Sequence, residues 1–147
     1  MTEDKRLRAR DMMTAGVHCV GAHQSLLDAS RMMRDLQVGA LPICGDDNRL
    51  KGMVTDRDIV VQCCAEGIDP ATVQAGTLSG AMYWVDAEAD ATEALEVMET
   101  HRIKRLPVID VQGGHRLIGM ISEANLAQNL SDEQIAEFAS RVYTVAP

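Results

Sequence analysis

The chain has 147 residues, a formal net charge of −8 and an apolar fraction of 46%, which suits one compact domain or two half-size units that share a core. The acidic surplus repels phosphate backbones, so we expect no broad binding of nucleic acid. No apolar run approaches the roughly 18 residues that a membrane span needs. The charged start, residues 1–10, lacks the apolar stretch of a signal peptide, so the sequence predicts a cytoplasmic protein and no membrane partner.

The first half of the chain predicts a β-α-β-β-α unit. Ser25 is a good N-cap, and Leu26, Ala29, Met33 and Leu36 follow it at helical spacing. In chain order, the expected elements are a strand at 17–20, a helix after Ser25, strands at 39–44 and 50–54, and a helix from 56 to about 66.

The same order recurs in the second half, 65 to 67 positions later. Leu106-Pro107 matches Leu41-Pro42, and the two extra residues of the second copy fall in the polar turn between its strands. Asp90 stands where Ser25 stands and predicts an N-cap, with Glu93 completing a capping box. The expected elements are a strand at 82–85, a helix after Asp90, strands at 104–109 and 117–121, and a helix at 123–129.

These elements predict an α/β (α+β) fold of two tandem units packed as one module with pseudo-two-fold symmetry. In each unit the strands that flank the first helix should be parallel, and the last two strands should form a hairpin. We place the first unit at 8–66, a linker at 67–76, the second unit at 77–130, and a C-terminal helix and tail at 131–147. Ser131 and Gln134 predict the capping box of that last helix.

Both copies carry Leu-Pro-Val/Ile and then Gly, two apolar residues and Thr or Ser, with Asp58 three residues after Thr55 in the first copy. This pattern resembles a tandem pair of CBS domains, a Bateman module, over about residues 8–130. Residues 41–58 are most similar to small stand-alone actinobacterial CBS proteins related to hypoxic response protein. The resemblance implies a regulatory module that binds an adenosine nucleotide or related adenosyl ligand, such as AMP, ADP, ATP or S-adenosylmethionine, in a cleft between the copies. It also implies a homodimer and, because no effector domain is attached, a separate effector protein.

The resemblance places the main ligand site in the first copy. Thr55 and Asp58 would contact phosphate and ribose at a helix N-terminus with free N–H groups, and Arg57 could pair with phosphate. A plain cap by Thr55 and Asp58 explains the same residues equally well. The remaining expected ligand-binding residues, which core packing also explains, are Gly16, Val17, His18, Ala40, Leu41 and Pro42.

The second copy departs from the pattern, because Asn125 replaces the acidic residue and Ala124 replaces Arg57. Asparagine accepts only through its carbonyl oxygen and carries no charge, and Glu123 would repel phosphate. We therefore expect a weaker, empty or differently tuned second cleft, formed by Met82, Tyr83, Arg105, Leu106, Pro107, Ser122 and Asn125.

Four cysteines and no CxxC pair argue against a disulfide-rich scaffold or a zinc knuckle. Cys19 and Cys44 belong to neighbouring predicted strands, so they could form a disulfide or could be two buried small hydrophobes. A metal site at His18, Cys19, His23 and Cys44 is a minor alternative, because the spacing matches no standard zinc motif.

No catalytic constellation is recognisable, so we expect no enzyme and no required cofactor. The main hypothesis is an adenosyl-ligand sensor. The alternative is a protein-interaction or stress-response scaffold that needs no nucleotide and could respond to redox state or metal. The apolar helix at 59–65 favours a homodimer, because it is apolar on more than one face.

Overall fold

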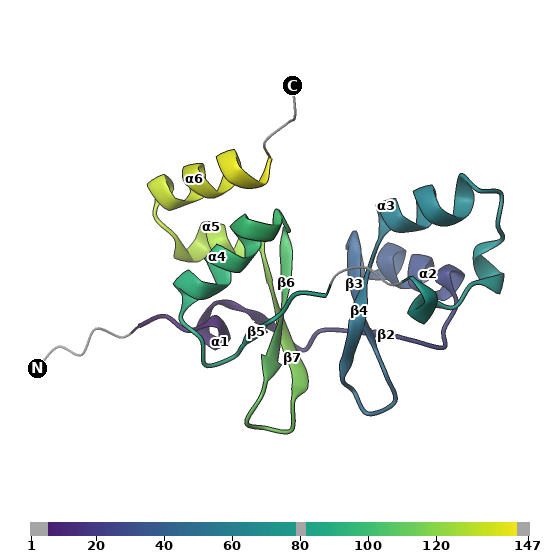
Figure 1. Cartoon of the computed structure of the whole chain (residues 1–147), viewed down its shortest axis with the longest axis horizontal. Coiled ribbons are helices and arrows are strands. Elements are labelled where there is room, and N and C mark those ends of the chain that lie inside the picture. The colour runs from purple at the N-terminus through teal and green to yellow at the C-terminus, as the bar shows by residue number, and fades with distance from the viewer. Residues whose placement is uncertain (1–5, 79–81, 144–147) are drawn as a thin grey trace, which may run out of the picture. The chain divides into compact units, whose positions relative to one another are not determined.

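The computed structural model describes residues 6–78 and 82–143, and the chain divides into two compact units (Figure 1). Unit 1 contains the chain up to Val17 and again from Tyr83, and unit 2 contains His18–Met82. Unit 2 holds the first β-α-β-β-α repeat and unit 1 holds the second, and each unit has a sheet of its own. This arrangement confirms the mixed α and β class and the predicted order of elements.

Unit 2 is built on a three-stranded sheet in the order β2-β3-β4. The central strand pairs in parallel with β2 and antiparallel with β4, as the crossover and hairpin predict. Its elements are β2 (Val20–Gly21), α2 (Leu26–Leu36), β3 (Ala40–Cys44), β4 (Leu50–Thr55), α3 (Asp56–Ile59), the π-helical η1 (Val60–Cys64), and the 3-10 turns η2 (Pro70–Thr72) and η3 (Ala75–Thr77). The buried face of α2 meets β3 and β4 in a core that includes Val20, Leu26, Ala29, Leu41, Ile43 and Val54.

Unit 1 has a four-stranded sheet in the order β1-β7-β6-β5. Its elements are α1 (Ala9–Met12), β1 (Thr14–Ala15), β5 (Val85–Asp86), α4 (Ala91–His101), β6 (Arg105–Asp110), β7 (Arg116–Ser122), α5 (Glu123–Asn129) and α6 (Asp132–Val142). The core includes Met12, Ala94, Met98, Leu106, Val108, Ile121, Leu126 and Phe138. It therefore takes side chains from α1 and α6 as well as from the second repeat.

The first strand of each repeat is shorter than predicted and lies further along the chain. The parallel ladder begins only at Val20 opposite Ile43 and at Val85 opposite Val108. The residues before each valine have no partner in that ladder. The predictions of strands at 17–20 and 82–85 were therefore wrong except for the buried valines at their ends.

One predicted helix cap was also wrong. Ser25 accepts a hydrogen bond from the Asp28 N–H at 3.0 Å, as predicted, and Ser131 caps α6 in the same way. Asp90 makes no side-chain cap, and no capping box forms with Glu93. The carboxylate of Asp90 instead lies 3.5 Å from the Arg6 guanidinium, because the N-terminal segment runs past this helix start.

The N-terminal segment joins the sheet of unit 1 through β1. Thr14 pairs with Met120 and Ala15 with Gly119, antiparallel along the edge of β7. A Cβ atom at Gly119 would lie 2.9 Å from the Thr14 carbonyl oxygen, so only glycine allows this close approach without a shift of the backbone. Within 6–78 and 82–143, no helix is long and apolar enough to cross a membrane.

Candidate functional site

The first candidate site lies where β4 ends and α3 begins, in unit 2. Thr55 accepts from the Asp58 N–H at 3.1 Å, and Asp58 Oδ2 accepts from the Thr55 N–H at 2.9 Å. This is the capping box that the sequence predicts as the plain explanation of these two residues. Ala40 lies directly opposite Thr55 in the β3–β4 ladder, so these three predicted ligand residues are brought together.

The expectation of free backbone donors at this helix start was wrong. The Asp56 N–H donates to the Gly39 carbonyl at 2.9 Å, and the Arg57 N–H donates to the Asp56 carboxylate at 2.8 Å. Since Thr55 takes the Asp58 N–H, the N–H groups of the first turn already have acceptors. A phosphate near this site would therefore depend on the exposed Arg57 side chain rather than on the backbone.

Asp58 keeps one carboxylate oxygen lightly engaged. Within the described part of the chain, its Oδ1 atom has a single long hydrogen bond, 3.4 Å from the amide nitrogen of Gln62, and the residue is half-buried. A carboxylate in this state can still accept hydrogen bonds from a ligand hydroxyl. The cap and a ligand contact are thus compatible in geometry.

The remaining predicted ligand residues of the first copy divide by burial. Leu41 and Pro42 are buried in β3 and pack in the core of unit 2, so core packing accounts for these two residues without a ligand. His18 is exposed in unit 2, whereas Gly16 and Val17 belong to unit 1.

The second candidate site, in unit 1, has the same backbone layout but a different side-chain network. Arg105 lies opposite Ser122 in the β6–β7 ladder, as Ala40 lies opposite Thr55. Asn125 is only 8% exposed and accepts from the Ser122 N–H at 2.8 Å and from the Ser122 hydroxyl at 3.0 Å. Its amide nitrogen donates to the Thr14 hydroxyl at 3.1 Å. Both ends of this amide are therefore used inside unit 1.

The other predicted residues of the second site are dispersed. Leu106 and Pro107 are buried in β6, like their counterparts in β3. Tyr83 stacks on His101 with ring centroids 3.8 Å apart, and Met82 is exposed in unit 2.

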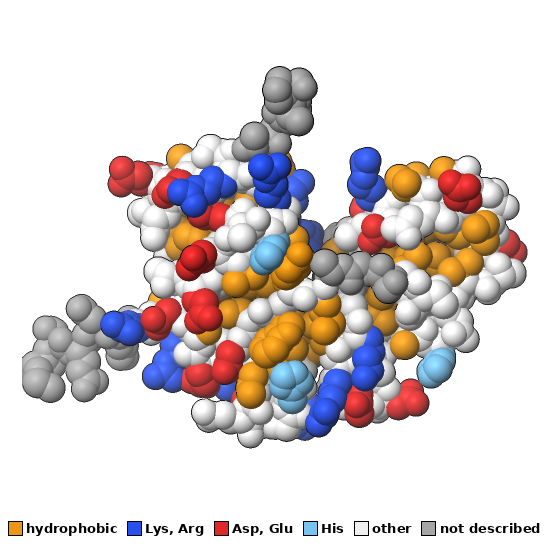
Figure 2. Space-filling view, viewed as in Figure 1, with side chains coloured by type: hydrophobic (Ala, Val, Ile, Leu, Met, Phe, Trp, Pro, Cys, Tyr) orange, Lys and Arg blue, Asp and Glu red, His pale blue; other side chains and the backbone are white. Residues whose placement is uncertain are grey.

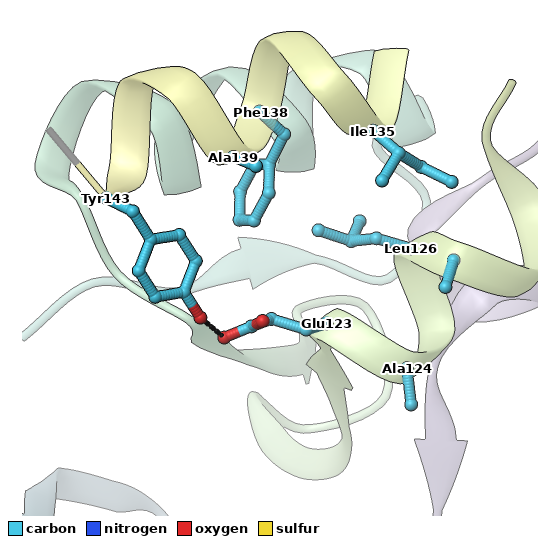
Figure 3. Close-up of a pocket in the computed structure, with 8 residues that line it drawn as sticks. Glu123, Ala124, Leu126, Ile135, Phe138, Ala139 and Tyr143 are labelled. Atoms are coloured by element: carbon cyan, nitrogen blue, oxygen red, sulfur yellow. Dashed lines mark hydrogen bonds between the residues drawn. The ribbon is translucent and has the colours of Figure 1, made fainter. Parts of the chain in front are cut away.

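Two contacts near the second site were missed by the sequence analysis. The Tyr143 hydroxyl, at the end of α6, donates to the Glu123 carboxylate, and Lys104 Nζ lies 4.2 Å from the centroid of the Tyr143 ring. Figure 3 shows Tyr143 pointing at Glu123 beside a cavity of about 330 Å³ that Phe138 and Ile135 also line. No sequence pattern links residues this far apart, so only the docking of α6 reveals the contact.

Cys19 and Cys44 form a disulfide between β3 and the residue before β2, with Cα atoms 5.7 Å apart. This resolves the two sequence alternatives in favour of the bond. Cys63 is buried, and burial raises the pKa of its thiol, whereas Cys64 is exposed. Among the described residues, no group of three or more His, Cys, Asp or Glu side chains could hold a metal ion, so His18 and His23 do not complete a site with the two bonded cysteines.

Comparison with known proteins agrees with this architecture. The model of the CBS domain matches twice, over residues 9–62 and 79–132. Hypoxic response protein 1 of Mycobacterium tuberculosis is 50% identical over 135 residues, which cover 91% of this chain and 92% of the relative. The crystal structure of hypoxic response protein I with two coordinated zinc ions superposes with a TM-score of 0.77 at 53% identity, covering 84% of this chain and 99% of that one.

A more distant solved structure, that of CBSX2 in complex with AMP, has a TM-score of 0.70 at 24% identity. It covers 83% of this chain and 94% of that one, and it shows the shared fold. The two matches of the domain model and the 50% identical relative together establish the family: this chain belongs to the CBS-domain proteins and carries two copies of the domain.

Proposed function

We propose that this chain is a non-catalytic regulatory module that binds an adenosine nucleotide or a related adenosyl ligand through the first repeat. The observation that carries the proposal is the half-buried Asp58, whose Oδ1 atom has one long contact and can accept from a ribose hydroxyl. Arg57 is exposed next to it and supplies a guanidinium for phosphate. A CBS protein of the same fold holds AMP, which supports the ligand class.

The second repeat takes no equal part in this proposal. Asn125 has its oxygen and nitrogen engaged by Ser122 and Thr14, so a ribose would have to displace both. The second repeat also lacks a guanidinium for phosphate, because Ala124 stands where Arg57 stands in the first repeat. We therefore expect one adenosyl ligand per chain.

The test compares two aspartates with the same capping role. Asp58→Asn should weaken the binding of AMP, ADP, ATP or S-adenosylmethionine about tenfold, which corresponds to the loss of one charge-assisted hydrogen bond. Asp28→Asn is the matched control, because Asp28 accepts from the Ser25 N–H at 3.1 Å in an equivalent capping box away from the candidate site. Calorimetric titration should show weaker binding only for Asp58→Asn.

A thermal-shift screen of the wild-type chain with these four compounds and zinc comes first. A ligand that binds only the folded protein raises the Tm by mass action. A shift with none of the nucleotides would reject the sensor and favour an interaction scaffold, and a shift with zinc alone would revive the site at His18, Cys19, His23 and Cys44.

The disulfide favours a second candidate function, a redox-responsive module. A dithiol reductant would break the Cys19–Cys44 bond, give each sulfur a proton and an electron, and itself become a disulfide. Intact-mass analysis after thiol blocking in denaturant should find two blocked thiols, Cys63 and Cys64, before reduction and four after it. Four blocked thiols without reductant would reject this candidate.

We also propose that the module pairs with a second copy through the helix Asp56–Cys64. Val60 and Val61 are 57% and 48% exposed there, with Arg57 at one end and Glu66 at the other. In a two-fold pairing the same patch of both copies meets, so Val60 and Val61 would be covered by the same face of the second copy. Val60→Glu should convert a dimer to a monomer in sedimentation analysis, and a monomeric wild-type chain would reject this pairing.

A further inference from the structure

The C-terminal helix α6 is fastened to unit 1 by both apolar and ionic contacts. Phe138 and Val142 are buried, at 4% and 7% exposed, in the core that also holds Leu126 of α5. Arg141 pairs with Glu99 of α4 at 3.0 Å. The end of α6 is therefore held in one place, and Tyr143 follows directly from it.

Tyr143 bridges two residues that come from separate elements of the second repeat. Its hydroxyl donates to Glu123, the first residue of α5 (Figure 3). Its ring lies under the Lys104 ammonium, 4.2 Å from Nζ to the ring centroid. Lys104 directly precedes Arg105, and Glu123 directly follows Ser122. We refer to Tyr143, Lys104 and Glu123 together as the Tyr143 clasp.

The first repeat shows what these positions look like without a clasp. Its counterparts of Lys104 and Glu123 are Gly39 and Asp56, which meet directly because the Asp56 N–H donates to the Gly39 carbonyl at 2.9 Å. In each repeat, one of these positions directly precedes the second strand, and the other is the first residue of the helix that follows the third strand. In the second repeat, Tyr143 contacts the side chains at both positions.

We infer that the C-terminal helix closes the second repeat's candidate site to anions, because the Tyr143 clasp engages Lys104, the neighbour of Arg105 in the chain, and holds the Glu123 carboxylate at the start of α5, directly after Ser122. An anion that reached Arg105 would have to separate Lys104 from the ring and move Glu123 away. On the face in Figure 2, Lys and Arg side chains around α6 lie among Asp and Glu side chains, so Lys104 and Arg105 are the cations that the inference concerns. The inference deepens the proposed function, on which it rests for the ligand, by stating how the second site is regulated.

The probe for this inference is inorganic pyrophosphate, which carries charge but no adenosyl group. Tyr143→Ala removes both contacts of the clasp and should tighten pyrophosphate binding by about threefold to tenfold, the range expected for an exposed cation–π contact with one hydrogen bond. Tyr143→Phe keeps the ring under Lys104 and should give a smaller gain. The gain should vanish in the double variant Tyr143→Ala/Arg105→Gln, which separates this site from any binding at Arg57.

Lysine acetylation gives a second measurement that needs no ligand. The chain has three lysines, and the exposed Lys51 in β4 serves as the internal reference for Lys104. The Lys104 rate relative to Lys51 should rise in Tyr143→Ala and change little in Tyr143→Phe. Melting curves and far-ultraviolet circular dichroism must show that α6 stays folded in both variants.

The outcomes separate this inference from the proposed function. Unchanged pyrophosphate binding in Tyr143→Ala, or a gain that persists without Arg105, would overturn the closure of the second site. An unchanged Lys104 acetylation rate would overturn the clasp itself. If AMP binds no form of the chain while both clasp measurements change as expected, the adenosyl function fails and the closure stands.

Discussion

The two helix starts at Thr55 and Ser122 show one backbone arrangement put to two uses. In both, the third residue of the helix accepts from the N–H of the residue before the helix, at 2.9 Å for Asp58 and 2.8 Å for Asn125. Among residues 6–78 and 82–143, the other Asp58 oxygen has one hydrogen-bond contact, from Gln62 at 3.4 Å, whereas Asn125 donates to Thr14 of β1. In unit 1, the extra edge strand β1 therefore supplies the Thr14 hydroxyl that accepts from the Asn125 amide and fixes its position. The sheet of unit 2, in the order β2-β3-β4, carries a helix start with a carboxylate that is still available.

The largest expected difference between the repeats comes from the disulfide. Cys19 and Cys44 are 25 residues apart, and their counterparts in the second repeat are Trp84 and Ile109, which cannot bond. Loss of a cross-link that closes a loop of this size removes about 3 kcal/mol of stability by the chain-entropy estimate. Cys19→Ser/Cys44→Ser should lower the Tm and the free energy of unfolding measured in urea, and Cys64→Ser is the control. An equal effect of reductant on the double variant and on the wild type would contradict the bond.

The next effect concerns the glycine shared by the last strands of the two repeats. Gly119→Ala would place a Cβ 2.9 Å from the Thr14 carbonyl, whereas a Cβ at Gly52 would meet nothing nearer than Ile43 at 3.7 Å. We expect Gly119→Ala to cost about 2 kcal/mol, in the range of overpacked sites. Gly52→Ala should change stability by less than about 1 kcal/mol. Equal Tm values for the two variants would show that β1 does not pair with β7 in solution.

A smaller difference should separate the two capping residues. Asn125→Ala leaves the Ser122 N–H and the Thr14 hydroxyl without partners and should cost about 1–2 kcal/mol. Asp58→Ala removes a half-exposed cap and should cost about 1 kcal/mol or less. Urea denaturation of both variants measures the difference. A larger loss for Asp58→Ala would mean that Asn125 is not the locked member of the pair.

The sequence predicted the elements that depend on local pattern and on the repeat. It missed the contacts that depend on how distant segments of the chain pack together. Helices α2, α4, α5 and α6 begin where the residues after Ser25, Asp90, Ser122 and Ser131 place them. The use of Asp90 by Arg6 and of Asn125 by Thr14 could not be predicted, because both partners come from an N-terminal segment with no periodic signal of its own. The candidate site followed the same rule. Its Thr55–Asp58 cap was predictable from spacing, whereas the use of the Asp56 N–H by the Gly39 carbonyl depends on how the segment before β3 meets α3.

The smallest expected effect is a shift in the pKa of Tyr143, and its titration tests the clasp without a change in fold. The hydrogen bond to Glu123, together with partial burial and the nearby carboxylate charge, raises the pKa of Tyr143 above its ordinary value of 10.0. A folded-state pKa above the unfolded one stabilises the native chain fully below pH 10, and this contribution is lost as the pH rises through the folded pKa. Glu123→Gln removes the charged acceptor, so the Tyr143 pKa should fall toward its ordinary value. Tyrosinate absorbance in a Tyr83→Phe background isolates Tyr143, since the chain has two tyrosines. The same Tyr143 titration curve with Glu or Gln at position 123 would mean that the hydroxyl does not donate to this carboxylate, whereas a shift to lower pH would tie the end of α6 to the start of α5.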